Sequence, residues 1–392
     1  MDGIYFDNGS TSFPKAPGTA EAMAELISRG AYNVNRGNYS GAYETEGMVR
    51  DTRELLAELF HAPDARNVIF TSGITCSVNM FLKGLLKPGD HIVTTSMEHN
   101  AVMRPLTQLE KEGISYTAVP ADKEGIVDPD DFERAVRTNT KAVIVNHASN
   151  VCGSIQPVRE IGRICRKHDL FYGVDTAQSA GTLDVDFDGC CMDFLGFTGH
   201  KGLLGPQGIG GFLISSRLAK EMVPLIAGGT GSVSDSFEMP ETMPDKYESG
   251  TINIPGIAGL NASLSYLKKT GVEKLHGKKM AAARYFLDAL KPLEDDGILK
   301  VPGPSRIEDR VAVVSVDFLH ADNAAVAFAL EEEAGIMTRV GLHCAPAAHK
   351  SIGTFPQGTV RFAFSAFNTI EEIDTAVTAL RKILSPEYRF FQ

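Results

Sequence analysis

The sequence predicts an α/β fold built on a mainly parallel, seven-stranded sheet, and two patterns in the chain predict it. Seven short runs rich in β-branched or aromatic residues alternate with segments of helical periodicity, an order that favours right-handed crossovers and a sheet covered by helices. Most of these runs are almost continuously apolar, as strands buried on both faces are. The runs lie at residues 67–73, 91–96, 115–120, 141–149, 171–178, 193–200 and 208–214.

The segments between and after these runs define the helices and a second unit. The first helical patterns lie at residues 76–86, 100–113, 128–136 and 157–169. After about residue 260 the pattern changes to one or two long helices at 256–293, a strand at 310–318, a helix at 322–335, a strand near 359–365 and a helix at 369–384. We therefore expect a large α/β domain over residues 16–260, and a small α+β domain made of residues 1–15 and 261–392.

One long segment contains no such pattern. Residues 228–251 are rich in Gly, Ser and Pro and poor in apolar residues, which predicts a long loop. Loops of this length usually have a functional or interface role, and its first part, 228–247, is distinctive.

Composition and charge exclude several classes of protein. The 392 residues are 43% apolar and 22% charged, which is typical of a globular protein, and the net charge is −11. Nucleic acids and anionic membranes are bound by basic surfaces, so we expect neither as a main partner. The N-terminus has no basic segment followed by an apolar run, and no stretch of about 18 apolar residues occurs, so we expect a cytoplasmic protein.

Polar residues that follow the predicted strands are the candidates for a binding site, because ligands of open α/β sheets lie at the carboxyl ends of the strands. After the first strand, Ser72, Gly73 and Thr75 precede a helix, where free backbone N–H groups favour a phosphate. The alternative is that Ser72 or Thr75 only caps this helix. No complete G-x-G-x-x-G or P-loop spacing supports a nucleotide site.

An imidazole and a carboxylate follow two of the later strands. His99 comes after the strand at 91–96 and either caps the next helix or offers its flat ring to a flat ligand. Asp175 ends an apolar strand, where a carboxylate is costly to bury without a cation or several donors. It either caps a helix or keeps a ring nitrogen of a ligand protonated.

Lys201 is the most informative of these residues. Most lysines near a sheet edge are solvated, but this one follows "DFLGF" and precedes "GLLGPQGIGG", where the backbone can approach a ligand closely. A partly dehydrated lysine has a lowered pKa and can form a Schiff base. A phosphate-binding turn, a stacking ring, a carboxylate for a ring nitrogen and this lysine, in that order, are typical of a pyridoxal phosphate site.

Several longer motifs occur in a characteristic order: "SGITCSVN", "EHNAV", "VDTAQSAG", "TGHKG", "ESGTINIPG" and "RVGLHCAP". With them the chain resembles, over nearly its whole length, the class V aminotransferase family of fold-type I pyridoxal phosphate enzymes. Within that family it is similar to cysteine desulfurases and selenocysteine lyases. The resemblance implies a PLP-dependent transferase fold of type I, L-cysteine or alternatively L-selenocysteine as substrate, a homodimer, and a sulfur-acceptor protein as partner.

The resemblance also implies a role for individual residues. Lys201 would form the Schiff base with the cofactor and act as a catalytic base. His99 would stack on the ring, Asp175 would pair with its nitrogen, and Gln178 would bond to its phenolic oxygen. The implied cofactor-binding set is completed by Gly73, Ile74, Thr75, Asn150, Thr198, His200 and, reaching the neighbouring subunit's site, Thr251. The implied substrate-binding residues are Arg361, which would hold the carboxylate, Asn150 and Arg339.

One position departs from the family. Relatives often have consecutive threonines where Ile74 precedes Thr75, so one donor to the phosphate is missing here. We therefore expect a lower cofactor affinity.

Cys344 selects the reaction, since the cofactor site alone fits transamination, racemisation and β-lyase chemistry equally. It lies in "TRVGLHCAPAAHK" between Gly341 and Pro346, which predicts a loop. A free thiol is only slightly ionised at pH 7, and cations nearby raise its thiolate fraction; Arg339 and His343 are the nearest in sequence. By composition alone, each of the six cysteines is best interpreted as an inert buried thiol. The match of "GLHCAP" to the desulfurase motif implies instead that Cys344 takes the sulfur as a persulfide.

Two alternative functions stay open. A selenocysteine or cystine lyase, or another class V aminotransferase, would share the cofactor site but would not need Cys344. A catalytically idle binding protein of the same fold is disfavoured by Lys201, Asp175 and Arg361. A zinc site around Cys344 lacks further ligands, and no C-x-x-C pair occurs, so we expect no metal.

Overall fold

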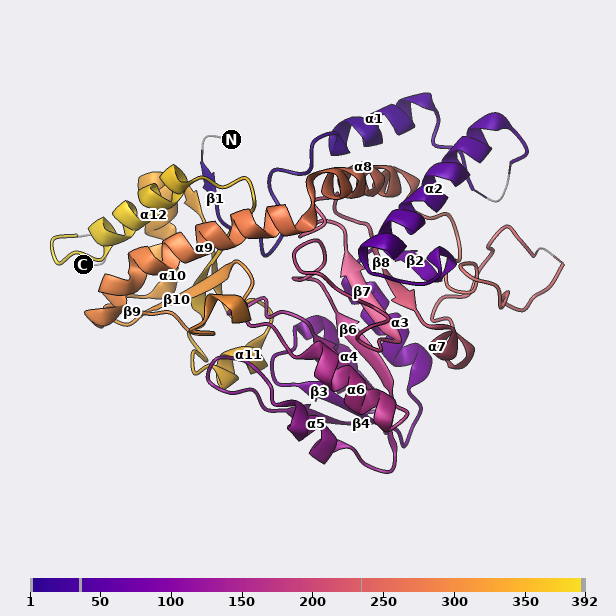
Figure 1. Ribbon diagram of the computed structural model, residues 1–392, viewed down its shortest axis with the longest axis horizontal. Coiled ribbons are helices and arrows are strands. Elements are labelled where there is room, and N and C mark those ends of the chain that lie inside the picture. The colour runs from indigo at the N-terminus through magenta and orange to yellow at the C-terminus, as the bar shows by residue number, and fades with distance from the viewer. Residues whose placement is uncertain (1–2, 35–36, 234, 389–392) are drawn as a thin grey trace.

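The centre of the computed structural model, which describes residues 3–34, 37–233 and 235–388, is a seven-stranded sheet of order β2-β8-β7-β6-β5-β3-β4 (Figure 1). Its strands are β2 (Val68–Thr71), β3 (His91–Thr95), β4 (Ser115–Val119), β5 (Thr140–Asn146), β6 (Phe171–Asp175), β7 (Phe194–Thr198) and β8 (Gly210–Ile214). Neighbouring strands from β4 to β7 are parallel, and β8 is antiparallel to both β7 and β2. The predicted α/β fold with a mainly parallel seven-stranded sheet is confirmed.

The sheet is buried on both faces, which explains the continuous apolar runs in the sequence. Successive side chains of a strand point to opposite faces. On β5, Val143 and Val145 therefore join one core cluster while Ala142 and Ile144 join another. All five residues of β3, β6, β7 and β8 are buried, whereas the edge strand β4 is only partly buried.

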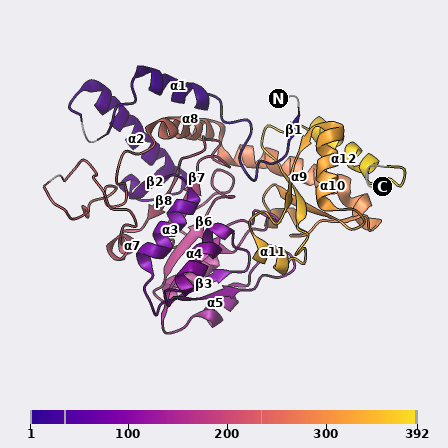
Figure 2. The ribbon, with the colours of Figure 1, turned by 180° about the vertical axis from the view of Figure 1, so that it is seen from behind.

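Helices cover both faces of this sheet. The core cluster on one face takes residues from α2 (Ser40–Leu59), α5 (Pro129–Ala135), α6 (Val158–Lys167) and α8 (Ile254–Thr270). The cluster on the other face takes residues from α3 (Ile74–Leu85), α4 (Asn100–Glu110) and α7 (Ser216–Glu221), the helices seen in Figure 2. The helix α1 (Thr19–Arg29) packs outside, on α8.

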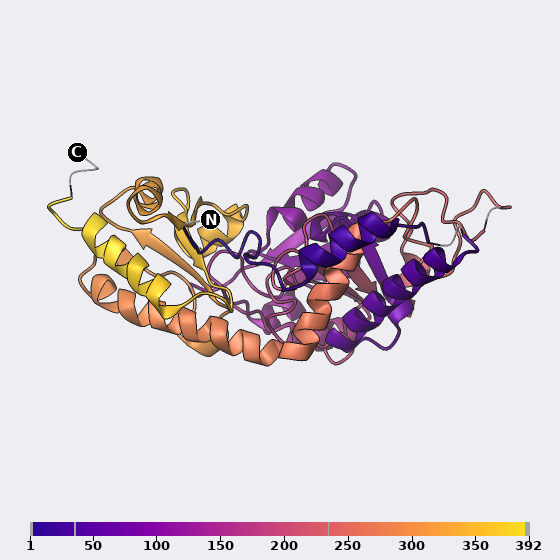
Figure 3. The same cartoon turned by 90° about the horizontal axis from the view of Figure 1, so that it is seen from above.

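The C-terminal part of the chain builds a second, smaller sheet of order β12-β13-β10-β9. Its strands are β9 (Leu299–Lys300), β10 (Val313–Phe318), β12 (Arg339–Gly341) and β13 (Thr359–Ala363). Its helices are α9 (Val272–Asp295), α10 (Asn323–Ala334), α11 (Pro346–Ser351) and α12 (Ile370–Ile383). Seen from above, α9 and α12 run side by side beneath this sheet, next to the larger unit (Figure 3).

The N-terminus packs on this second unit, as expected. The short strand β1 (Ile4–Tyr5) pairs in parallel with β11 (Ile336–Met337), and Phe6 is fully buried in the core of the C-terminal part. The chain then crosses to the larger unit at α1 (Figure 1). Residues 3–15 therefore connect the second unit to the larger one, which the Ser12 N–H reaches at the His200 carbonyl.

Most predicted elements are found, and the long loop is too. The pattern at 256–293 forms two helices, α8 and α9, which meet at Gly271 with a φ of 90°. Outside 234, which is not described, residues 223–253 contain no helix or strand. Short 3₁₀ turns lie at Ala65–Asn67 and Ile307–Asp309. None of the described helices combines the length and apolarity needed to cross a bilayer.

Candidate active site at the carboxyl edge of the sheet

The candidate residues gather because parallel strands end at one edge of the sheet. Strands β2, β3, β5, β6 and β7 all run in the same direction, since β2 and β7 are both antiparallel to β8. The register pairs Asn146 with Asp175 and Asp175 with Gly196, so β5 and β6 end level and β7 extends two residues further, to Thr198. The turns that follow these strands carry the polar side chains.

Lys201 follows β7 in a turn whose backbone is buried on its C-terminal side, with Leu203 and Leu204 almost inaccessible. Burial lowers the pKa of Lys201 to about 8, although Asp175 partly offsets this, and the cations Arg361 and Arg339 lower it further. Among the described residues, no hydrogen bond engages its amine. Such an amine is available as a nucleophile or base near neutral pH.

Asp175 is the last residue of β6 and only 4% exposed. Its carboxylate accepts a hydrogen bond from the Ala177 N–H at 2.8 Å. Burial raises the pKa of Asp175, while this hydrogen bond and the positive charge of Lys201 act against the rise. Gln178, in the turn that follows, donates from Nε2 to the carbonyl of Gly9 at 2.9 Å, which ties the N-terminal segment to this edge.

His99 caps α4, one of the two alternatives that the sequence left open. Its Nδ1 accepts the Ala101 N–H at 3.0 Å, which places the proton of the neutral ring on Nε2. Burial lowers the pKa of His99 to about 4, and Lys201, Arg339 and Arg361 add to the effect. The ring is therefore neutral and fixed in orientation, as a stacking group requires.

The turn between β2 and α3 forms a cradle without side chains. The N-cap of α3 is Gly73, with a φ of 146°, and no side chain caps the helix. The alternative that Ser72 or Thr75 caps α3 is therefore wrong. The N–H groups of Gly73 and Cys76 are engaged within the turn, and those of Ile74 and Thr75 have no acceptor among the described residues, which leaves them for an anion. The Ile74 side chain fills the space over Gly196 on the sheet, so at this position only the backbone can serve a phosphate.

Thr198 and His200 complete this cradle from the end of β7. A Cβ on Gly73 would lie 3.6 Å from Thr198 Oγ1, so the two turns are adjacent. The Nδ1 of His200 is buried and has no partner among the described residues, and burial lowers the pKa of this imidazole to about 4.

Arg361, on β13 of the second unit, reaches this site from the C-terminal part, as Arg339 on β12 does. It is only 1% exposed and pairs with Asp7, Nη2 to Oδ1, at 2.7 Å. Its Nη1 donates to the carbonyl of Asn150 at 2.9 Å, so the guanidinium is held by both units. Burial lowers the pKa of Arg361, and Asp7 opposes this.

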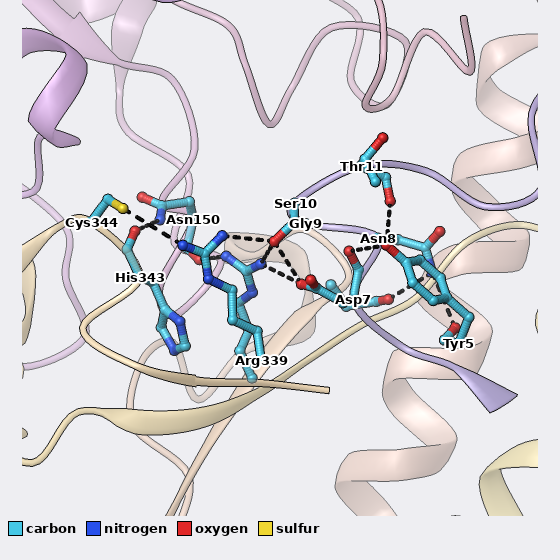
Figure 4. Close-up of polar contacts among 12 residues, drawn as sticks. Tyr5, Asp7, Asn8, Gly9, Ser10, Thr11, Asn150, Arg339, His343 and Cys344 are labelled. Carbon is cyan, nitrogen blue, oxygen red and sulfur yellow. Dashed lines mark hydrogen bonds and ion pairs between the residues drawn. The ribbon is translucent and has the colours of Figure 1, made fainter. Parts of the chain in front are cut away.

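Cys344 is an exposed thiol in the loop after β12. The Arg339 Nη2 lies 3.6 Å from its Sγ (Figure 4). The loop is tight, since His343 and Cys344 both have positive φ, 49° and 59°. It is anchored by Asn150 Nδ2, which donates to the His343 carbonyl at 2.7 Å, and by the Asn100 N–H, which donates to the Cys344 carbonyl at 2.8 Å.

The expectation that His343 could serve as a cation for this thiol is wrong. Its ring points away from Cys344 (Figure 4) and contacts Thr359 Oγ1 at 3.1 Å. Burial, with Arg361 nearby, lowers the pKa of His343 to about 2, so the ring is neutral. Arg339 is the cation beside the sulfur.

Thr251 is the predicted residue that the structure does not bring to this edge. It is exposed, and within the described part of the chain its side chain contacts Asn33 at 3.4 Å.

Two cavities lie near these elements. A small cavity of about 40 Å³ beside Lys201 is lined by Gln178 and Gly9, among others. A larger cavity, of about 740 Å³, lies between α2, α8 and α9, and none of the predicted site residues lines it. The described residues hold no cluster of three or more metal-binding side chains.

Three residues near the N-terminus belong to this site and were missed by the sequence reasoning. Asp7 pairs with Arg361, and Ser10 Oγ accepts hydrogen bonds from both Arg361 and Arg339 at 2.8 Å (Figure 4). Lys15 donates to the His200 carbonyl at 2.9 Å, and burial lowers its pKa to about 8. The available signal was the run of polar residues directly after the apolar "IYF" at the N-terminus.

These residues fit pyridoxal phosphate. The uncapped turn at Gly73 and the unpaired His200 Nδ1 are a donor set for a phosphate. Asp175 is a buried carboxylate for a ring nitrogen, and Lys201 an amine with a lowered pKa. The unpaired Nε of Arg361 is a donor for a substrate carboxylate.

Comparisons with known proteins agree with this geometry. A family model described as aminotransferase class-V matches residues 4–376. A protein of Methanothermobacter thermautotrophicus described as "Probable cysteine desulfurase" is 35% identical, over 97% of this chain and 95% of its own length. A solved cysteine desulfurase from Thermococcus onnurineus superposes with a TM-score of 0.90 at 31% identity, covering 98% of this chain and 95% of that one. The cysteine desulfurase CsdA of Escherichia coli gives 0.87 at 28% identity, covering 97% and 94%.

Proposed function

Because this chain belongs to the class V aminotransferase family, we propose that it is a cysteine desulfurase, which converts L-cysteine to L-alanine and takes up the sulfur on Cys344. The fold is that of the fold-type I pyridoxal phosphate enzymes, and the family depends on this cofactor. The observation that carries the proposal is the convergence of Lys201, Asp175, Arg361 and an exposed Cys344 beside Arg339.

The residues that would hold the cofactor are those at the sheet edge. Pyridoxal phosphate, when bound, supplies an aldehyde that condenses with amines and a ring that withdraws electrons from the substrate. Lys201 would anchor it, and Gly73, Ile74, Thr75, Thr198 and His200 would hold its phosphate. Asp175 would keep the ring nitrogen protonated, His99 would stack on the ring, and Gln178 would bond to the phenolic oxygen.

On the substrate side, Arg361 would bind the carboxylate of L-cysteine, because a planar guanidinium can hold both oxygens. Asn150, which contacts both Arg361 and the Cys344 loop, would fix the distance between carboxylate and thiol. Lys201, with a pKa of about 8, would take the proton from the α carbon.

The sulfur transfer would be carried by Cys344. Its thiolate, paired with Arg339, attacks the sulfur of the substrate. A sulfur–sulfur bond forms, the bond between sulfur and the β carbon breaks, and its electron pair stays with the three-carbon fragment. That fragment takes up protons and leaves as L-alanine, while Cys344 is left as a persulfide for an acceptor protein.

We also propose that the enzyme is a homodimer. Thr251 lies apart from the other predicted residues of its own chain, which is what a residue serving the partner's phosphate site requires. The proposed unit of residues 1–15 and 261–392 would then carry Arg361 and Cys344 against the cofactor unit of residues 16–260.

The test is alanine formation from L-cysteine by the cofactor-loaded protein, with a thiol reductant to release sulfide. We expect turnover by the wild-type chain and a loss of about 100-fold or more in Cys344→Ser, because a hydroxyl cannot take the sulfur. Cys191→Ser, at another partly exposed cysteine, is the matched control and should keep full activity. Alanine formed at an unchanged rate by Cys344→Ser would contradict the persulfide step and favour the lyase alternative. L-Selenocysteine would then be the next substrate to test.

A further inference from the structure

The cluster around Arg361 carries more positive than negative charge. Ser10 lies at its centre, where its Oγ donates to Asp7 Oδ1 at 2.8 Å and accepts from Arg339 and Arg361 (Figure 4). Asp7 is the one carboxylate in this hydrogen-bonded cluster of described residues, so two guanidinium groups share a single anion. The surplus charge favours the entry of one further anion.

The hydrogen bonds of Arg361 show where that anion would bind. Nη2 donates to Asp7 at 2.7 Å and to Ser10 at 2.8 Å, which engages both of its hydrogens. Nη1 donates to Asn150, and the buried Nε has no partner among the described residues. A guanidinium holds both oxygens of a carboxylate through Nε with Nη2 or through Nη1 with Nη2. Both arrangements need Nη2, which is already engaged.

Of the two partners in this ion pair, the guanidinium is the more tightly packed and the carboxylate is the more exposed. A Cβ on Gly9 would lie 2.9 Å from Arg361 Cζ, so the backbone at Gly9 packs closely over the guanidinium. Arg361 is 1% exposed, whereas the Asp7 side chain is 21% exposed and lies in the segment just after β1. An entering anion would therefore displace Asp7 and leave Arg361 in place.

We propose that Asp7 is an internal stand-in for the substrate carboxylate. It neutralises Arg361 when no substrate is bound, and the substrate carboxylate must displace it from Nη2 to be held at both oxygens. Asp7 thereby weakens substrate binding by competition, while it keeps a buried arginine paired between turnovers. This inference rests on the proposed role of Arg361 as the carboxylate site.

The test measures binding without turnover. The probe is 3-mercaptopropionate, which has the carboxylate and thiol of the substrate but no amine to condense with the cofactor, and its dissociation constant is measured by calorimetry on the cofactor-loaded protein. Asp7→Asn, which keeps the shape and removes the charge, should bind the probe about tenfold more tightly, because the hydrogen bond that the probe must displace from Nη2 no longer joins two opposite charges. The exposed Asp130→Asn, in α5, is the matched control and should bind like the wild type.

Two further measurements make the result decisive. Ser10→Ala frees one hydrogen of Nη2 and should also tighten binding, which keeps the test available if Asp7→Asn does not fold. The alcohol 3-mercapto-1-propanol should bind all variants equally, since it has no carboxylate. Unchanged or weaker binding of 3-mercaptopropionate by the folded variants would overturn the proposal. Arg361→Lys distinguishes a failure of this inference from a failure of the proposed function. If this variant binds 3-mercaptopropionate as the wild type does, then Arg361 is not the carboxylate site and the proposed function fails at that point.

Discussion

Asp175 and Lys201 are two ionisable groups whose environments bring their pKa values towards each other. Burial raises the pKa of Asp175 and lowers that of Lys201 to about 8, while each group's charge stabilises the charged form of the other. In the proposed enzyme the carboxylate keeps a ring nitrogen protonated and the amine is free to take a proton near neutral pH.

The variant Asp175→Asn separates these roles. Asparagine can still accept the Ala177 N–H, but without a negative charge it cannot keep a ring nitrogen protonated. We expect alanine formation from L-cysteine to fall about 100-fold or more, a typical contribution of a positioned proton-holding group, while the cofactor remains bound to Lys201. Steady-state kinetics and cofactor absorbance, measured on the same sample, check this. Wild-type activity in a fully loaded variant would contradict the role given to Asp175.

For individual residues, the sequence predicts a role when that role follows from the position of the residue after a strand. Lys201 and Asp175 are of this kind, since Asp175 ends the apolar run of β6 and Lys201 comes three residues after β7. Asp7 is not, because its role comes from an ion pair with Arg361, 354 positions away. His343 shows the opposite error: it is adjacent to Cys344 in sequence, but the turn directs its ring away from the thiol.

Among the elements, the first turn of α3 is the one whose sequence matters most for the cofactor. Its N-cap Gly73 has a φ of 146°, which residues with a side chain rarely adopt, and no side chain caps the turn. We expect Gly73→Ala to weaken pyridoxal phosphate binding about tenfold, because strain of the usual size at such a position distorts the phosphate cradle. Equilibrium dialysis of the cofactor measures this.

Gly47→Ala is the matched control for this variant. Gly47 lies within α2, where an added Cβ would meet nothing within 4 Å. Alanine favours the interior of a helix, so this variant should bind the cofactor normally and melt at the same or a higher temperature. Equal cofactor affinity in Gly73→Ala and Gly47→Ala would show that the phosphate is held elsewhere.

The elements themselves were largely predictable, and the exceptions have physical reasons. The central strands are buried on both faces and so produce continuous apolar runs, which are easy to recognise. The strand β12 has three residues, and its contacts with β13 come from the second sheet and not from any local pattern. The Cys344 loop likewise takes its shape from Asn150 and Asn100, which belong to the other unit.

For the whole molecule, buried histidines make stability depend on pH. Burial lowers the pKa of seven of the ten histidines, namely His91, His99, His147, His200, His276, His343 and His349. Groups with a lowered folded-state pKa stabilise the fold above their unfolded value, near 6.5, and this contribution is lost as the pH falls below it. Glu98, with a pKa raised to about 8, and Asp175, whose pKa burial also raises, act in the opposite direction, but they are two groups against seven.

We therefore expect the melting temperature to fall between pH 7 and pH 5 at constant ionic strength. The unfolded chain takes up protons on these histidines over this interval, whereas the folded chain does not. Differential scanning calorimetry at several pH values measures the change. A melting temperature that stays constant or rises on acidification would show that the histidines are not buried as described.

The surface of the whole molecule supports the proposed dimer. Ile226 and Phe237, in the long loop, and Tyr43, on α2, are exposed apolar residues. A cavity of about 730 Å³ lies between this loop and α2, with Tyr43 and Thr230 in its lining, so these segments are adjacent. Exposed apolar side chains on adjacent segments are typical of a protein–protein interface.

Light scattering tests this arrangement. We expect a mass twice the 42.3 kDa of one chain, and a shift towards the single chain in Phe237→Asp, which would place a charge in the interface. Leu319→Asp is the matched control, because Leu319 is an exposed apolar residue of the second unit and should leave the mass unchanged. A wild-type mass of one chain at micromolar concentration would remove the role proposed for Thr251.

The proposed chemistry depends on Lys201 as the amine that holds the cofactor, and borohydride trapping followed by peptide mass mapping measures this directly. Lys15 and Lys279 serve as internal controls, since burial lowers their pKa values to about 8 as well. Protein loaded with pyridoxal phosphate and reduced should carry the label on Lys201 and on neither of the other two. A label on Lys15 or Lys279, or none on Lys201 in loaded protein, would contradict the account.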